Sequence, residues 1–143
     1  MNKVIEREEH FLEEELNLHE TLFFNANGYI GVRGTLEEGV PASFQTMRGM
    51  YLNGVHEVIP MKQAESLCNL VEKKQTMLNV ADTQTITLTV CGEPFSLQEG
   101  TVLRNTRVLD MEAGVTERRI HWRSPSGKEI RLHIRRMTSF LLP

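Results

Sequence analysis

Cysteine is scarce in this chain, which has only Cys68 and Cys91 among its 143 residues. Two cysteines form one bridge at most, so a disulfide framework is excluded. Neither cysteine lies in a C-x-x-C pair or in a Cys/His cluster with the spacing of zinc ligands. We interpret both as reduced thiols, buried or half-buried, because free cysteine usually behaves as a small hydrophobic side chain.

The sequence also has no large excess of charge of one sign and no long apolar run. The 16 basic and 19 acidic side chains give a net charge of −3, which creates no overall field toward nucleic acid or an anionic membrane. Acidic residues interrupt the N-terminal sequence MNKVIEREEHFLEEEL, so it fits neither a secretory signal nor a membrane span. We expect a cytoplasmic protein with no cofactor and with neither nucleic acid nor a membrane as partner.

The rest of the composition is that of an ordinary globular protein, with 40% hydrophobic and 24% charged residues. A chain of this length buries enough surface for one folded domain with a substantial core. We therefore treat residues 1–143 as a single domain.

Alternation of apolar and polar residues is the strongest local signal after residue 75. Residues 85–90 predict a strand that places Ile86, Leu88 and Val90 on one face. Residues 102–109 predict a second extended segment after a turn at 98–100. The fold class indicated is mainly β.

Residues 117–135 predict a hairpin to the level of register. Pro125 suits the first central position of a type I turn, and Gly127 suits the left-handed position that follows. That loop pairs Ser124 with Lys128, and counting outward gives the other pairs. They are Trp122 with Ile130 and Ile120 with Leu132 on the core side, and Glu117 with Arg135 and Arg123 with Glu129 on the other.

The first half of the chain is less regular. Residues 5–16 fit a helix and a strand equally well, because their apolar stripe is thin. Residues 18–24 predict one helical turn, 29–32 and 49–55 predict strands, and 65–74 fit a loop or a short helix. Residues 135–143 end in apolar residues without a cap or turn, from which we expect the sequence to stop before the next strand.

The densest motif is ETLFFNANGYIGVRGTLEEG, residues 20–39. Its glycines indicate tight turns and close approach of the backbone. The spacing fits neither GKS/T nor GxGxxG at the start of a helix, so a phosphate-binding loop is disfavoured. A packed turn between two strands is the simpler interpretation.

Three blocks in a fixed order carry a family resemblance. They are NGYIGVRGTLEEG, then RGMYLNG at 48–54, then LDMEAG at 109–114 with Arg118. Together they resemble the N-terminal domain of glycoside hydrolase family 65, which contains inverting α-glucoside phosphorylases. This chain departs from the family pattern at Met50, where threonine is common, and at 24–26.

The resemblance implies an antiparallel β-sandwich of the galactose-mutarotase-like kind, here truncated, with one or two short helical turns. It also implies a following α/α barrel that carries the acid glutamate and the phosphate site, and a homodimer. Such a chain would support the barrel and the dimer without catalysing. Glu20, Glu37, Glu38 and Asp110 are therefore not proposed as catalytic carboxylates, and we propose no catalytic or metal-binding residue.

The remaining candidates are assigned structural roles first. Arg33 and Arg118 are expected to hold turns or domain contacts, and Tyr51 and Asn53 are weak candidates for a loop that reaches a sugar site. His121 and His133 share a basic face with Arg119, Arg123 and Arg131, which favours a solvated or covered surface over a metal or nucleic-acid site. The structural motif residues are Asn27, Gly28, Gly31, Arg33, Gly34, Glu38, Gly39, Gly54, Asp110, Gly114 and Arg118.

A stand-alone carbohydrate-binding sandwich is the alternative function. It requires an exposed aromatic platform, for which the chain offers Trp122, Tyr29 and Tyr51. Because Trp122 is predicted on the core side of its hairpin, this alternative is the weaker one.

Overall fold

The computed structural model describes residues 3–8, 10, 12–61 and 71–140. Its elements follow in the order β1 (Val4–Glu8), α1 (Glu13–Leu22), β2 (Asn25–Ala26), β3 (Ile30–Val32), β4 (Met50–Pro60), β5 (Lys73–Asn79), β6 (Thr89–Val90), β7 (Glu93–Pro94), β8 (Thr101–Asp110), β9 (Val115–Arg123) and β10 (Glu129–Arg136). The chain is mainly β with antiparallel sheets, consistent with a truncated β-sandwich.

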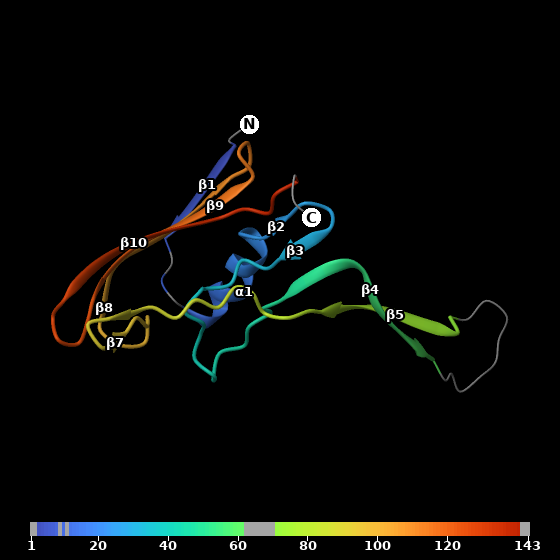
Figure 1. Ribbon diagram of the computed structural model, residues 1–143, viewed down its shortest axis with the longest axis horizontal. Coiled ribbons are helices and arrows are strands. Elements are labelled where there is room, and N and C mark those ends of the chain that lie inside the picture. Colours follow the sequence, from blue (N-terminus) through green and yellow to red (C-terminus); the bar gives the residue numbers. More distant parts are fainter. Residues whose placement is uncertain (1–2, 9, 11, 62–70, 141–143) are drawn as a thin grey trace.

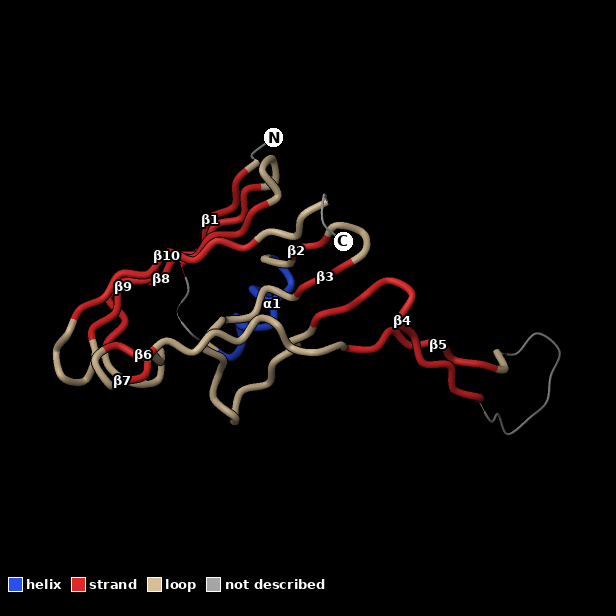
Figure 2. The backbone as a smooth tube through the Cα atoms, in the orientation of Figure 1, coloured by secondary structure: helices blue, strands red, loops and turns tan. Residues whose placement is uncertain are grey.

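Two four-stranded sheets flank the helix (Figure 1). One has the strand order β1-β8-β9-β10 and the other β2-β3-β4-β5, while β6 and β7 form a small separate pair. The hairpin of β4 and β5 extends away from α1 (Figure 2). Most of its described residues are exposed. No helix in the described ranges is long and apolar enough to cross a membrane.

The predicted hairpin is confirmed in every pair. Ile120 lies opposite Leu132 and Trp122 opposite Ile130, while Glu117 and Arg123 lie opposite Arg135 and Glu129. The loop closes with a 2.7 Å hydrogen bond from Ser124 N to Lys128 O, and Gly127 has a φ of 87°. The inward side packs on Phe95, whose ring meets the fully buried Trp122 edge to face at 5.4 Å.

The predicted strand at 85–90 is wrong except at its end. Only Thr89 and Val90 pair, with β7, and Ile86 is 59% exposed. Alternation of apolar and polar residues indicates an extended backbone, but a β-strand also requires a neighbouring strand with which it forms hydrogen bonds. This segment instead crosses from β5 to the sheet that contains β8, held by a bond from Ile86 N to Glu37 O (3.1 Å).

The ambiguous N-terminal region contains both structures, a strand (β1) and then a helix (α1). The helical turn expected at 18–24 is confirmed for residues 18–22, but these form the second half of the longer, ten-residue α1. Glu13, Glu14 and Glu15 occupy the first turn of that helix, where negative charge stabilises the helix dipole.

The strands expected at 29–32 and 49–55 are confirmed as β3 and the first half of β4, and that at 102–109 as β8. The loop or short helix expected at 65–74 falls largely on residues 62–70, outside the described residues, and Lys73 and Lys74 belong to β5. Cys68 also lies outside them. Cys91 is a free thiol, as predicted, but it is exposed rather than buried.

Candidate functional site

A cluster of buried charges joins the β1-β8-β9-β10 sheet to the glycine-rich motif. Alternation along β9 turns Arg118 to the core side, together with Ile120 and Trp122. Its guanidinium is 3% exposed and donates to Glu37 Oε2 at 2.9 Å and to both carboxylate oxygens of Glu38 at 2.6 and 2.7 Å. A charge in this position needs such partners, because an unpaired buried charge is strongly unfavourable.

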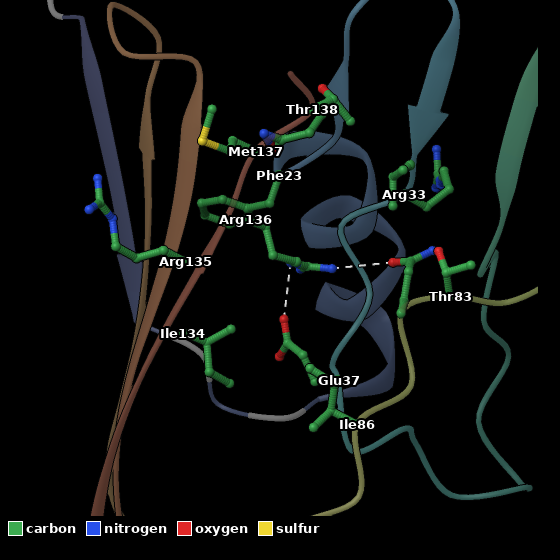
Figure 3. Close-up of a pocket in the computed structure, with 13 residues that line it drawn as sticks. Phe23, Arg33, Glu37, Thr83, Ile86, Ile134, Arg135, Arg136, Met137 and Thr138 are labelled. Atoms are coloured by element: carbon green, nitrogen blue, oxygen red, sulfur yellow. Dashed lines mark hydrogen bonds and ion pairs between the residues drawn. The ribbon is translucent and has the colours of Figure 1, made fainter. Parts of the chain in front are cut away.

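Arg136 supplies the second cation of the cluster from β10. Its Nε lies 3.0 Å from Glu37 Oε1, and its Nη2 donates to Thr35 O at 2.9 Å. A third bond, from Nη1 to Gln84 Oε1 (3.2 Å), brings in the segment that follows β5. Figure 3 shows the side chain of Arg136 extending from β10 toward Glu37.

The two carboxylates project from a turn. Gly39 N donates to Leu36 O at 3.2 Å, and Gly39 has a φ of 86°, a left-handed conformation that glycine adopts without strain. Because the turn reverses the chain at this point, Glu37 and Glu38 both reach Arg118.

The charges of the cluster keep Glu37 and Arg118 ionised. Burial alone raises the pKa of Glu37, but the charges of Arg136 and Arg118 outweigh burial and bring the pKa below its ordinary 4.5. Burial likewise lowers the pKa of Arg118, while its bonds to Glu38 and Glu37 raise it above the ordinary value. A general acid needs a proton to give near neutral pH, so Glu37 is not suited to that role.

A second buried network ties the motif to α1 and β8. Gly34 N donates to Glu20 O at 2.8 Å, and Gly34 O accepts from Arg107 Nη2 at 2.5 Å. The guanidinium of Arg107 also lies 4.4 Å from the ring centre of Phe23. A Cβ atom on residue 34 would lie 2.6 Å from Phe23 O, so only glycine fits there.

The carboxylate of Glu20 is fully buried and accepts from Met47 N at 2.7 Å and from the Thr46 hydroxyl. It holds the loop before β4 against the helix. Asp110 has a comparable local role, because its Oδ1 accepts from Glu112 N and Ala113 N at 3.0 Å in the turn between β8 and β9.

A pocket of about 380 Å³ lies beside the charge cluster (Figure 3). Its wall combines the ends of β10 and β3 with the segment at 83–86. The polar side chains that line it include Arg33, Gln84 and Arg136. All three also make contacts within the chain, and Arg33 Nη2 donates to Thr21 Oγ1 at 3.0 Å.

The other motif residues lie at turns or, like Gly31 and Gly54, within strands β3 and β4. Asn27 Oδ1 accepts from Tyr29 N and Ile30 N at 2.9 and 2.7 Å, which closes the loop between β2 and β3. Four more glycines of the set are accounted for by backbone conformation or close packing. Gly28, Gly54 and Gly114 have φ values of 86°, 88° and 65°, and Gly31 lies under the ring of Phe24.

The basic side chains on the outward face of β9 and β10 form ion pairs with glutamates of the same strands. His121 and Arg123 contact Glu129, and His133 and Arg135 contact Glu117, at 2.6 to 3.1 Å. Within the described ranges, no three His, Cys, Asp or Glu side chains are placed to hold a metal ion.

Tyr51 and Asn53 lie together on the other sheet. They line a hollow of about 350 Å³ with Phe24, Tyr29 and Met77 on the sheet formed by β2, β3, β4 and β5. The sequence did not indicate Phe24 in this group, nor Arg107, Asn105 and Arg136 in the buried networks. The alternation along β8 did not reveal Arg107, because the strand has a bulge between Val102 and Arg104 that shifts which side chains face the core.

Comparison with known proteins gives a single family. Residues 7–143 match the glycosyl hydrolase family 65 N-terminal domain. The α,α-trehalose phosphorylase of Geobacillus stearothermophilus is 44% identical over 130 residues, which are 90% of this chain and 17% of that protein. The kojibiose phosphorylase of Escherichia coli K12 is 30% identical over 132 residues, 92% of this chain and 15% of that protein.

A solved structure shares the fold. A putative kojibiose phosphorylase from the human microbiome superposes with a TM-score of 0.78 at 21% identity, covering 96% of this chain and 18% of its own. This chain thus spans less than a fifth of the length of each of these relatives.

The lowered pKa of Glu37 predicts a pH dependence of stability. A carboxyl with a lower pKa in the folded state stabilises the fold above its unfolded value of about 4.5, and this contribution is lost as the pH falls through the folded pKa. We expect Glu37→Gln to cost about 3 kcal/mol at pH 7, because it leaves buried arginine charge unmatched. The difference in unfolding free energy between Glu37→Gln and the unaltered chain should become smaller as the pH falls below 4.5.

Urea unfolding at several pH values measures this difference. Glu57→Gln is the matched control, because Glu57 is exposed on β4, and its unfolding free energy should follow that of the unaltered chain. A Glu37→Gln deficit that stays constant from pH 7 to acid conditions would contradict the assignment.

Proposed function

This chain belongs to glycosyl hydrolase family 65 as its N-terminal domain, and from that membership we propose that it is the non-catalytic sandwich segment of a longer phosphorylase. The intact enzyme splits an α-linked glucosyl disaccharide with inorganic phosphate into β-glucose 1-phosphate and a free sugar. The match over residues 7–143, with relatives named as trehalose and kojibiose phosphorylases, carries the proposal.

The chemistry of inversion agrees with a site elsewhere in the polypeptide. A carboxylic acid must protonate the glycosidic oxygen while a phosphate oxygen attacks the anomeric carbon from the opposite face. In this chain Glu37 and Glu38 are bound by Arg118, and Glu20 is bound by backbone and hydroxyl donors. Carboxylates held in this way support an architectural role.

The main partner in this proposal is a C-terminal catalytic barrel of the same polypeptide, with residues 1–143 as part of the preceding sandwich. The chain covers 15% to 19% of its relatives' lengths, which leaves ample room for one. The motif residues, from Asn27 to Arg118, shape the turns and the buried cluster of this segment rather than contact substrate. The cytoplasm is the proposed location.

A stand-alone carbohydrate-binding module is less well supported. Its largest aromatic candidate, Trp122, has no exposed surface and donates its indole N–H to Glu99 O at 2.8 Å. The hollow lined by Tyr51 and Asn53 is compatible both with a segment of a phosphorylase and with a carbohydrate-binding module.

Activity separates the two functions. This chain alone, mixed with inorganic phosphate and trehalose, kojibiose, maltose or nigerose, should release no detectable glucose 1-phosphate. The gene product that extends past residue 143 should release it from at least one of these sugars. Turnover by the 143-residue chain would contradict the proposal, as would a longer product that lacks a barrel with an acid glutamate.

We also propose a homodimer formed through open strand edges. The edge strands are β1 and β10 in one sheet and β2 and β5 in the other, and unpaired edges readily pair with another chain. Light scattering on this chain should give the mass of a dimer at micromolar concentration. A monomer throughout a wide concentration range would exclude this assembly.

A further inference from the structure

The β2-β3-β4-β5 sheet carries a hollow whose lining is uncharged. Among the nine described residues that line it are three aromatic side chains and one amide, and none of the nine is charged. Its volume of about 350 Å³ lies within the range of small-ligand sites, ~300–1,000 Å³. Phe24 and Tyr29 are 41% and 48% exposed, although apolar side chains of this size are usually buried.

Two glycines make room for the rings. A Cβ atom on residue 31 would lie 3.0 Å from Phe24 Cζ, and one on residue 49 would lie 2.7 Å from the Tyr51 hydroxyl oxygen. The rings of Phe24 and Tyr51 therefore lie directly over backbone that has no side chain of its own. Such close support fixes the orientation of each ring.

Tyr29 is fixed through its backbone. The side-chain oxygen of Asn27 accepts from Tyr29 N at 2.9 Å, and Gly28 adopts a φ of 86° in the same turn. Tyr29 O in turn accepts from Asn53 N at 2.8 Å, which places Tyr29 beside the residue that carries the amide. The aromatic and the amide groups of the hollow are thus held by ordered strands and a closed turn.

We propose that this hollow binds a pyranose unit of a neutral glucosyl sugar. One face of a pyranose ring presents C–H groups that pack on aromatic rings, while its hydroxyls hydrogen-bond with groups such as the Asn53 amide and the tyrosine hydroxyls. The absence of charge among the lining residues favours a neutral ligand over a phosphorylated one. Only the choice of a glucosyl sugar rests on the proposed function.

The test reads binding and not turnover, because the proposed function assigns no turnover to this chain alone. Amide chemical shifts of this chain are followed by NMR during titration with glucose, trehalose and maltoheptaose, which separates a free monosaccharide or disaccharide from the end of a longer α-glucan as the source of the unit. At least one should shift the amides of Gly31, Tyr51 and Asn53 in a saturable manner, with a Kd of about 1–10 mM.

Tyr29→Ala should weaken binding about tenfold, because it removes the most exposed ring, whereas Tyr29→Phe should keep most of the affinity. Phe140→Ala is the control, since Phe140 is 83% exposed and does not line the hollow. A far-ultraviolet circular dichroism spectrum checks that Tyr29→Ala is folded.

The proposal is overturned if no sugar shifts these amides up to about 50 mM, if the shifts fall on another face, or if Tyr29→Ala binds as tightly as Phe140→Ala. None of these results bears on phosphorolysis by the longer gene product. Failure here and failure of the proposed function are therefore separate observations.

Discussion

The buried ion pairs of Arg118 with Glu37 and Glu38 are the constraint on which the rest of this structure depends. Taking three charges out of water costs several kcal/mol for each, and only close and complete pairing offsets that cost. The partners come from β9 and from a turn about eighty positions earlier in the chain. The ion pairs therefore join the sheet to the glycine-rich motif in the folded chain, and Arg136 extends the same link to β10 and Gln84.

The glycine-rich motif combines close backbone approach with buried carboxylates. The glycines permit close approach, as at Gly34 against Phe23 O, and the approach brings the carboxylates within reach of the arginines. Once bound, Glu37 stays ionised at neutral pH. The motif joins the sheet to α1 through these buried contacts.

Local physics allowed part of the fold to be predicted from the sequence. The β9–β10 register was predictable because period-two alternation and a Pro-Ser-Gly turn allow one pairing, and a slip would bring Ile120 opposite Arg131. Residues 85–88 have the same alternation yet form no ladder, since the partner strand, which sequence pattern cannot show, is absent from the described residues. For residues 5–16 the apolar stripe is too thin to distinguish a helix from a strand, so the sequence did not predict where β1 ends and α1 begins.

The site was predictable only in outline. Arg118 and Asn27 were identified as structural, but nothing local pairs Arg118 with Glu38, because the contact depends on how distant segments pack. The same holds for Arg107 over Phe23 and for the gathering of Phe24, Tyr29 and Tyr51 around one hollow. Each of these contacts joins elements that meet only in the folded chain.

A double-mutant cycle between Arg118 and Glu38 tests the central claim most directly. Arg118→Met, Glu38→Gln and the double variant are compared by urea unfolding, with the outward pair Arg119 and Glu117 as the reference cycle. The account predicts a coupling free energy of about 2–3 kcal/mol for the buried pair and at most about 1 kcal/mol for the exposed one. Additive effects at Arg118 and Glu38 would contradict it.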